Sequence, residues 1–484
     1  MRYFSCRLLL LVSVFLVLSS LRMTAQDGHY WSEQYGTRST LLNGAVIGSV
    51  EDMGAVYYNP ARLAIIEEPT FTLTAKIYEW QRTVIEDAIG EGADLSESRI
   101  GGIPNLAAGT FSIGELDRHV FAYSFLTRQS SETDFFVRAD RTGDILDDLS
   151  GEEIFSGEVN WRKGLKEEWF GVSWSHSLWS NVSVGITQFI TVRNQSSLFE
   201  VQLQALSEEG ETAFLVRKRD FDYQTVGLRW KMGLALDFSP FAAGVTFTTP
   251  KLPVLGNGSF RFEDFFTGVD IDGDGEPKNL FITDVQDDLD TRYRSPLSIG
   301  FGLGYTLGRH QLHLSGEWFG GTGEYDILQT DPFVGQSTGQ LLQVRLLEEL
   351  DPVFNVGIGF ELYLGERFSA YGSFATDFSS VNSRINRFVE LADKTNNSVF
   401  RADLFHFAAG AEFNVKQADI ILGLSFARAS QETLRPINLP DGTGEVIFGS
   451  RQTSTIDWQR LRIVFGFTLP LTKEMRNQLE EEAE

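Results

Sequence analysis

The chain has 484 residues, with 41 Lys and Arg against 66 Asp and Glu, and its formal net charge of −25 argues against nucleic-acid binding. Aromatic residues make up 13% of the sequence and glycines number 46, while no apolar run after residue 25 is long enough for a transmembrane helix. This composition favours β-structure over a helical membrane protein.

Residues 1–25 have the pattern of a Sec signal peptide. Two arginines precede an apolar run from Leu8 to Leu18, which is too short to span a membrane, and a candidate cleavage site follows Ala25. The single cysteine, Cys6, lies before that run, which argues against lipoprotein processing and predicts a mature chain without disulfides. Removal of this segment lowers Lys and Arg from 41 to 38 against 66 acids, so the net charge becomes about −28.

The stretch 36–64 is rich in small residues and ends in a turn. Small side chains let a backbone pack closely against a wall, and a proline fixes its own φ and keeps the residue before it out of the helical region. An ordinary glycine-rich loop is the alternative interpretation. The stretch contains the run G-x-x-x-G-x-x-x-D-x-x-A-x-x-x-N-P-A, formed by Gly44, Gly48, Asp52, Ala55, Asn59, Pro60 and Ala61.

Alternation with a period of two recurs along the rest of the chain. From Leu297 to Leu307 the odd-numbered residues are apolar or aromatic, and the even-numbered residues are Ser, Gly or Thr. From Phe354 to Leu364 the even-numbered residues are the apolar ones. An apolar face beside a small or polar face suits a strand with lipid outside and a lumen inside.

The alternation predicts fourteen strands, at 71–80, 104–113, 119–127, 169–178, 182–205, 218–237, 241–249, 293–307, 310–319, 353–364, 368–378, 404–415, 419–428 and 456–469. Tight turns, such as 179–181, 308–309 and 365–367, follow the even-numbered strands, and loops of roughly a dozen to more than forty residues follow the odd-numbered ones. This pattern predicts an all-β, transmembrane antiparallel barrel over residues 69–470. It places the short turns and both termini in the periplasm and the long loops outside.

A barrel of this size needs something in its lumen. A closed sheet pairs every backbone group that faces hydrocarbon, but fourteen strands enclose a space too wide for wall side chains to fill. Residues 26–68 are therefore expected to form a plug.

The motif in 44–61 resembles the N-terminal hatch of the FadL-like (OmpP1/FadL/TodX) outer-membrane transporters, which carry long-chain fatty acids and related hydrophobic molecules. Arg62 stands where that family usually has a small residue. The resemblance implies a multi-pass protein of the bacterial outer membrane, in contact with its lipid, that takes up a hydrophobic small molecule passively. The hatch would gate the channel, and the ligand would leave sideways through the wall. A FadL-like barrel of a type IX secretion apparatus, or a structural outer-membrane protein, is the alternative.

A candidate calcium loop lies between the seventh and eighth predicted strands. An acidic residue at alternate positions, with Gly275 among them, matches the first half of an EF-hand loop. Phe281 occupies the twelfth position, where an EF-hand needs Glu, so a complete EF-hand is excluded. Two interpretations are left. The run is either a partial calcium site completed by Asp284 or carbonyl groups, or an acidic turn without metal. The acids are Asp270, Asp272, Asp274 and Glu276.

Sequence motifs of catalysis are absent. The chain contains no G-x-S-x-G, P-loop or H-E-x-x-H run, so we expect no enzyme and no cofactor other than calcium. Lumen-facing His313, Glu317, His406 and Glu412 are expected to solvate the interior. Arg and Lys side chains in the lumen could hold a fatty-acid carboxylate.

The last predicted strand resembles the aromatic-rich C-terminal strand that the barrel-assembly machinery reads, which implies that machinery as a partner. Pro470 ends the strand because proline cannot continue the ladder. The charged residues 471–484 are expected to form a periplasmic tail.

Overall fold

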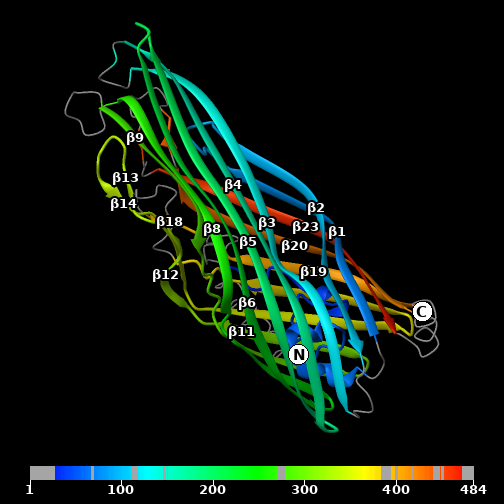
Figure 1. Ribbon diagram of the computed structural model, residues 1–484. Helices are drawn as coiled ribbons and strands as arrows, with labels where there is room; N and C mark the ends of the chain where they lie inside the picture. The colour runs from blue at the N-terminus through cyan, green and yellow to red at the C-terminus, as the bar shows by residue number, and fades with distance from the viewer. Residues whose placement is uncertain are drawn as a thin grey trace, which may run out of the picture.

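The computed structural model describes residues 28–66, 70–111, 118–144, 149, 151–269, 278–382, 394–397, 402–415, 418–435, 437–439, 447–448 and 452–470. Within these ranges the chain forms a closed antiparallel barrel, and the N-terminal segment, residues 28–66, lies inside it (Figure 1). The signal peptide, the acidic run 270–276 and the tail 471–484 lie outside the described residues.

Fourteen strands form the ring, each hydrogen-bonded to the next, and β1 pairs with β23 to close it. In ring order they are β1 (Thr70–Ile85), β2 (Leu95–Phe111), β3 (His119–Gly143), β4 (Glu153–Trp179), β5 (Val182–Ser207), β6 (Thr212–Phe238), β7 (Phe241–Thr248), β10 (Ser298–Leu307), β11 (His310–Phe319), β16 (Val353–Gly365), β17 (Phe368–Asp377), β19 (Leu404–Val415), β20 (Ala418–Leu434) and β23 (Thr453–Pro470). The predicted all-β antiparallel barrel of fourteen strands is confirmed, and each predicted strand corresponds to one of these.

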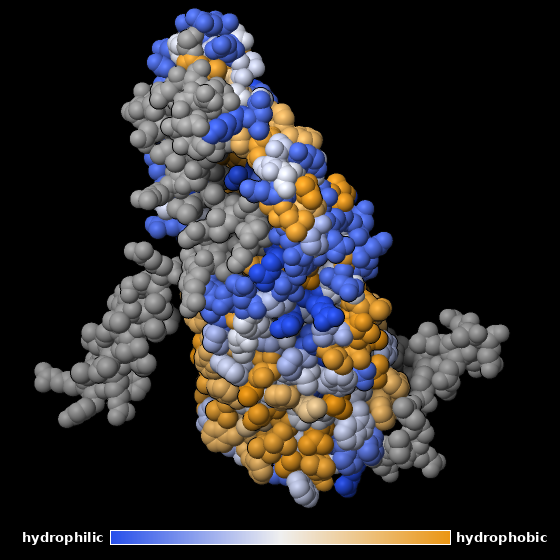
Figure 2. Space-filling view, turned by 60° about the vertical axis from the view of Figure 1, so that its left-hand side comes forward, coloured by the Kyte–Doolittle hydropathy of each residue, from blue (hydrophilic) through white to orange (hydrophobic). Residues whose placement is uncertain are grey.

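The apolar face of the strands points outward, as the alternation predicts. Ile299 and Phe301 of β10 are 43% and 50% exposed, whereas Ser298, the first residue of the strand, is buried. Figure 2 shows apolar side chains gathered on the lower half of one face, with polar side chains above them. We call the end with the short connections, such as 180–181 and 308–309, the turn end of the barrel, and the opposite end the far end.

Several of the predicted long loops are in fact strand. β3 and β4 continue as a hairpin up to residues 143 and 153, and β5 and β6 are joined by only 208–211. β4 and β6 have 27 residues each, which corresponds to a length of about 90 Å. The prediction failed because the alternation reverses here: Trp161 is buried inside, and the neighbouring Arg162 is exposed and pairs with Asp134. Strands that have water on their outer side carry polar residues there.

Smaller sheets occupy the far end. β8 (Leu252–Val269) pairs with the upper part of β6 and with β9 (Lys278–Asp290), so the predicted loop 250–292 is also largely strand. The remaining short strands are β12 (Thr322–Gln329), β15 (Arg345–Leu350) and β18 (Lys394–Asn396) in one sheet, β13 (Phe333–Val334) with β14 (Leu341–Leu342), and β21 (Ile437–Asn438) with β22 (Ile447–Phe448).

The N-terminal segment contains two helical turns and a short 3-10 helix. These are α2 (Arg38–Leu41), α3 (Ala55–Tyr58) and η2 (Pro60–Ile65). η2 lies against β4, β5 and β6, while α2 lies against β17, β19 and β20 on the other side of the ring. The segment therefore reaches across the lumen. No helix in the described part of the chain is long and apolar enough to cross a membrane.

We expect the protein to be heat-modifiable in gel electrophoresis. The inter-strand hydrogen bonds form a closed circuit, which resists mild detergent until heating opens it. Unboiled and boiled samples should migrate at different positions. Identical migration in several detergents would contradict a closed barrel.

Candidate functional site

A buried carboxylate holds the N-terminal segment in shape. Asp52 accepts hydrogen bonds from Ser39 N at 2.9 Å, Ser39 Oγ at 2.8 Å, Gly54 N at 2.9 Å and Thr37 Oγ1 at 3.3 Å. Burial raises the pKa of the Asp52 carboxyl, and the hydrogen bonds from Ser39 and Gly54 oppose that rise. The motif aspartate thus ties residues 37–39 to residues 52–54 inside the barrel.

Asn59, Pro60 and Ala61 form the turn that the sequence predicts. The Asn59 side chain accepts from Ala61 N at 3.1 Å, which caps η2, and Pro60 stands at the first position of that helix. Asn59 Nδ2 donates to Ile47 O within the segment and to Leu234 O of β6, at 2.9 and 3.1 Å. One side chain therefore stabilises the turn and attaches it to the wall.

The motif glycines serve two different needs. Gly44 has a φ of +72°, in the left-handed region that favours glycine. Gly48 lies against the backbone of Gly302 on β10, where a Cβ would collide with the Gly302 carbonyl. Ala55, which begins α3, is also completely buried. These small residues allow the segment to touch the wall backbone to backbone.

Arg62, which departs from the family pattern, has partners of its own. Its guanidinium is buried, pairs with Asp237 at the turn end of β6 and donates to Val50 O at 3.0 Å. Asp237 and Arg62 lie far apart in sequence, so this pair could not be predicted from the sequence. The arginine fastens η2 to the wall.

The first described residues attach the segment to the opposite wall. Asp377 Oδ1 on β17 accepts from the backbone N–H groups of Tyr30 and Trp31 at 3.0 and 2.9 Å. The Trp31 indole donates to Glu317 Oε2 of β11 at 2.9 Å. Arg128 of β3 donates to Tyr30 O at 2.7 Å.

An ion cluster surrounds Glu33 where the ring closes between β1 and β23. Glu33 pairs with Lys76 of β1 and, at 2.6 Å, with Arg462 of β23, which also pairs with Glu79. Arg460 lies 3.9 Å from Glu33. The Glu33, Lys76, Arg460 and Arg462 side chains are at most 4% exposed, so these charges depend on one another for compensation.

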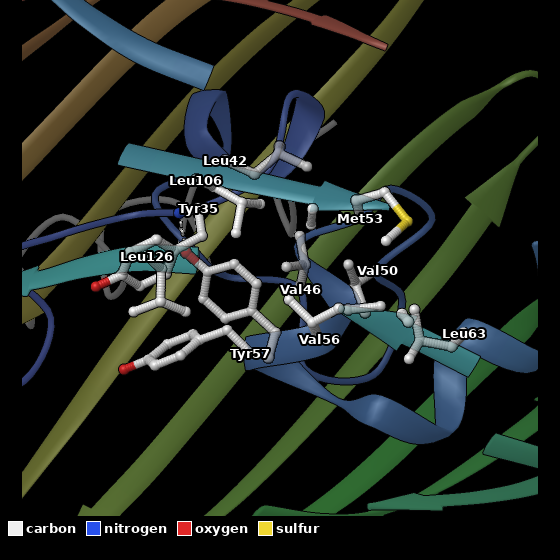
Figure 3. Close-up of a cluster of buried hydrophobic side chains, with 14 of the residues drawn as sticks. Tyr35, Leu42, Val46, Val50, Met53, Val56, Tyr57, Leu63, Leu106 and Leu126 are labelled. Carbon is white, nitrogen blue, oxygen red and sulfur yellow. Dashed lines mark hydrogen bonds between the residues drawn. The ribbon is translucent and has the colours of Figure 1, made fainter. Parts of the chain in front are cut away.

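An apolar cluster joins the segment to β2 and β3 (Figure 3). Tyr35 and Tyr57 stack at a tilt with ring centroids 4.5 Å apart. Leu106 of β2 and Leu126 of β3 complete the cluster from the wall and are completely buried. The segment contributes Tyr35, Leu42, Val46, Val50, Met53, Val56, Tyr57 and Leu63.

The backbone ladder between β2 and β3 ends beside this cluster. It joins 106–111 to 121–126 and, in the described residues, does not continue beyond them, although β2 still pairs with β1 and β3 with β4. Side chains bridge the β2–β3 seam (95–105 of β2 against 127–143 of β3): Arg99 pairs with Glu132 at 2.7 Å, and Thr127 Oγ1 donates to Pro104 O at 3.0 Å. Behind the seam, Tyr35 Oη donates to Thr127 O at 3.1 Å.

Sequence reasoning missed this seam. Its one sequence signal is Pro104, which has no N–H and can donate a ladder hydrogen bond to neither neighbour. A proline inside a strand marks an edge or an irregularity. Pro104 is instead the first residue of the predicted strand 104–113.

Three cations meet above the aromatic residues of the cluster. Arg128 and Arg229 lie 5.7 and 5.5 Å from the Trp169 ring centroid, and Lys231 Nζ lies 4.7 Å from that of Tyr57. We call Arg128, Arg229 and Lys231 the cation shelf. Among the described residues, no carboxylate lies within ion-pair distance of Arg128 or Arg229, and Arg128 Nη1 has no hydrogen-bond partner.

The lumen-facing histidines and glutamates face inward as predicted, but they do not solvate the interior. His313, Glu317, His406 and Glu412 are all buried. His313 Nδ1 is 2.7 Å from Ser49 Oγ, Glu317 holds Trp31, and Glu412 accepts from Tyr371 Oη at 2.5 Å. Glu412 also lies 3.5 Å from Arg38 Nε, so three of the four bind the N-terminal segment directly.

The calcium prediction falls outside the structure. Asp270, Asp272, Asp274 and Glu276 are not among the described residues. Phe281 and Asp284 belong to β9. Within the described ranges, no group of three or more His, Cys, Asp or Glu residues could hold a metal ion.

No protein-family model matches the sequence, and no curated protein matches it. Solved structures do match. A Pseudomonas aeruginosa FadL homologue aligns with a TM-score of 0.57 and 11% sequence identity, over 92% of this chain and 100% of that chain. The P. putida toluene transporter TodX aligns with a TM-score of 0.57 and 13% identity, over 90% and 99%. The chain has the FadL-type barrel fold.

The Ralstonia pickettii toluene transporter TbuX has the same FadL-type fold, with a TM-score of 0.52, 13% identity and coverage of 90% and 98%. The predicted resemblance is confirmed at the level of the fold. These structural neighbours are transporters and channels, and at such identities they establish architecture alone.

We expect Asp52→Asn to loosen the N-terminal segment without opening the barrel. The amide replaces an acceptor oxygen by a donor that faces other donors, which costs about 1–3 kcal/mol. Trypsin cleavage at Arg38 should then rise by roughly tenfold or more, because local opening becomes easier. The measurement is limited proteolysis of folded, heat-modifiable protein.

Glu51→Gln is the matched control, since Glu51 is adjacent, its side chain is 34% exposed, and its 2.9 Å ion pair with Arg38 is open to solvent and contributes little. It should leave cleavage at Arg38 within about twofold of the parent, as expected for a surface substitution. Equal cleavage of the Asp52 and Glu51 variants would show that the carboxylate does not organise the segment.

Proposed function

We propose that the protein is a channel of the bacterial outer membrane for the passive uptake of hydrophobic molecules. The observation that carries the proposal is the meeting of the apolar cluster with the β2–β3 seam. A hydrophobic solute inside the barrel needs apolar surface to rest on and a gap in the hydrogen-bonded wall to leave by, and both lie around Leu106 and Leu126. The outward apolar face of the strands supports the membrane location.

The path begins at the far end. An apolar pocket lies inside the tall wall formed by β3 and β4, lined by residues such as Phe135, Val137 and Trp161. Below it the solute would meet the cation shelf and then the apolar cluster. It would leave through the lower end of the seam into the lipid.

The cation shelf favours an amphiphile with an acidic head over an uncharged hydrocarbon. Arg128 is buried without a carboxylate partner in the described residues, and its Nη1 has no hydrogen-bond acceptor there, which a fatty-acid carboxylate would supply. Arg229 adds positive charge beside it, although its own donors are bonded to Thr249 O, Ser295 Oγ and Pro296 O. Toluene, which the descriptions of TodX and TbuX specify, has no anionic group to pair with these cations. We therefore infer that long-chain fatty acids are the substrate class.

The N-terminal segment would act as the gate. It lies behind the seam through Tyr35 and is fixed to both walls by Asn59 and Asp377. A small shift of Tyr35 away from Thr127 O would free the lower end of the seam. Catalysis has no part in this proposal, and a calcium ion at the acidic run 270–276 would have a structural role only.

A secretion shuttle of the type IX class, or a structural role, remains the second candidate. Neither needs the apolar cluster or an unpaired cation in the lumen. Lipid extraction of the purified protein separates the candidates: copurifying fatty acid favours uptake, and a copurifying secreted protein favours the shuttle.

Tethering the seam should block uptake. In a Cys6→Ser background, Arg99→Cys with Glu132→Cys places two thiols across the seam, for joining by a short cleavable bismaleimide. We expect uptake of a fluorescent long-chain fatty acid into whole cells to fall to background after crosslinking and to recover after cleavage.

The control pair Lys166→Cys with Asn194→Cys spans the continuous ladder between β4 and β5. Its crosslinking should leave uptake unchanged. Normal uptake through a fully crosslinked seam would rule out this exit.

The gate predicts that Asn59→Ala with Pro60→Ala changes transport while the barrel remains intact. The substitutions remove the cap of η2 and the bond to Leu234 O, at a cost of about 1–3 kcal/mol for the segment. The protein should still insert and be heat-modifiable. Leak of small solutes, measured in liposomes, should increase if the segment only obstructs, and fatty-acid uptake should be lost if its ordered form builds the pocket.

Asn194→Ala, on the outer face of β5, is the control for a lost asparagine. A double variant that inserts, leaks and transports like the parent would show that residues 28–66 are a passive filler.

A further inference from the structure

A pocket on the outer face of the barrel contains two arginines. It has a volume of about 550 Å³ and lies where three chain corners meet: 250–253 between β7 and β8, 292–297 before β10, and 318–322 between β11 and β12. Arg292 and Arg294 line it and are exposed. The pocket therefore offers positive charge on a chain whose net charge is −25.

Among the residues that the structure describes, these two arginines lack the acidic partners that several other exposed arginines above the apolar band have. In the described part of the chain, neither Arg292 nor Arg294 has a carboxylate within ion-pair distance, although acids outnumber basic residues in this protein. Exposed arginines on other strands do have such partners, as in the pairs Arg138–Glu158, Arg162–Asp134, Arg261–Asp220 and Arg428–Asp457.

The pair is held by β12. Arg294 N donates to Tyr325 Oη at 3.0 Å, and its guanidinium lies 4.9 Å from the Tyr325 ring centroid. Arg292 N donates to Ile327 O at 2.8 Å. Because these contacts already fix the backbone of both arginines and the side chain of Arg294, the two residues lose less conformational freedom when a ligand binds, which favours binding. Lys251 also lines the pocket, but its ammonium group turns inward to Thr225 Oγ1 at 2.9 Å.

Apolar side chains border the pocket. Trp318 lines the pocket and is 40% exposed. Ile299 and Leu252 follow shortly after the lining residues Leu297 and Lys251 in the sequence and are 43% and 53% exposed. Leu297 begins the outward apolar row of β10. Tryptophan is typical of the boundary between hydrocarbon and headgroups in membrane barrels. The arginines therefore lie at headgroup level, above a surface suited to acyl chains.

We propose that this pocket binds the phosphorylated headgroup of a lipid in the outer leaflet. Arg292 and Arg294 bind a phosphate through charge-assisted hydrogen bonds, and Trp318 and the β10 face contact the acyl chains. An anion of another kind, without chains, would gain from the arginines but not from the apolar border. The inference depends on the proposed membrane location and is independent of any transported ligand.

The test uses the full-length mature protein in detergent and native mass spectrometry with lipid A, and the same lipid stripped of its phosphates. The parent should retain lipid A in preference to the stripped form. Arg292→Gln with Arg294→Gln should lower lipid A retention by roughly tenfold or more and leave the stripped lipid unchanged.

Two further variants keep the result interpretable. Arg292→Lys with Arg294→Lys preserves the charge and should retain part of the preference, while its heat-modifiability reports folding. Arg82→Gln removes an exposed arginine of β1 that, within the described ranges, also has no carboxylate within ion-pair distance, and it should retain lipid A as the parent does.

Equal retention of lipid A by the parent and the glutamine variant would overturn the proposal. So would displacement of lipid A by millimolar inorganic phosphate alone, because the site would then be one for free phosphate. Fatty-acid uptake should be unchanged in the glutamine variant. Failure of the uptake experiments with intact lipid A binding would overturn the proposed function and leave this site standing.

Discussion

A backbone polar group that faces hydrocarbon must have a hydrogen-bond partner, and the wall follows from this constraint. Fourteen strands pair all the way round where their outward residues are apolar. The β2–β3 ladder stops at Leu106 and Leu126, just below the level where Arg99 and Glu132 bridge the two strands. The Arg99 and Glu132 side chains are 37% and 63% exposed there, so charged side chains and water can satisfy the freed backbone groups.

The interior of the barrel is organised by the same requirement for buried polar groups. The N-terminal segment contains only short helical turns, so several of its polar groups are not bonded within it. They form hydrogen bonds with the wall instead, to Leu234 O, Asp377 and Glu317. Asp52 does the same within the segment by accepting from residues 37, 39 and 54. The result is a filling that is held by discrete contacts, each of which can be broken alone, around a small apolar cluster. Such an arrangement can be ordered and still able to shift.

Part of this structure could be predicted from the sequence, and the reasons are local. Leu297–Leu307 reveals its strand because lipid outside and lumen inside impose opposite polarities on neighbouring residues. The upper halves of β3 and β4 were missed for the same reason. Water lies outside them, so the apolar residue Trp161 faces inward and the charged residue Arg162 faces outward. Asn59 and Pro60 could be placed in a turn from their own chemistry. The pair Arg62–Asp237 and the cation shelf could not be predicted, because they depend on strands that meet only after the ring has closed.

The charges at the junction of β1 and β23 have a consequence for the order of assembly. Lys76, Arg460 and Arg462 become buried when the first and last strands of the ring meet, and Glu33 lies among them. A buried cation without its partner costs roughly 3–5 kcal/mol. Joining the strand ends before the N-terminal segment is in place would leave an excess of positive charge at the joint. Closure of the ring and docking of Glu33 therefore favour each other, so the step that makes the wall continuous is also the step that fixes the N-terminal segment inside it.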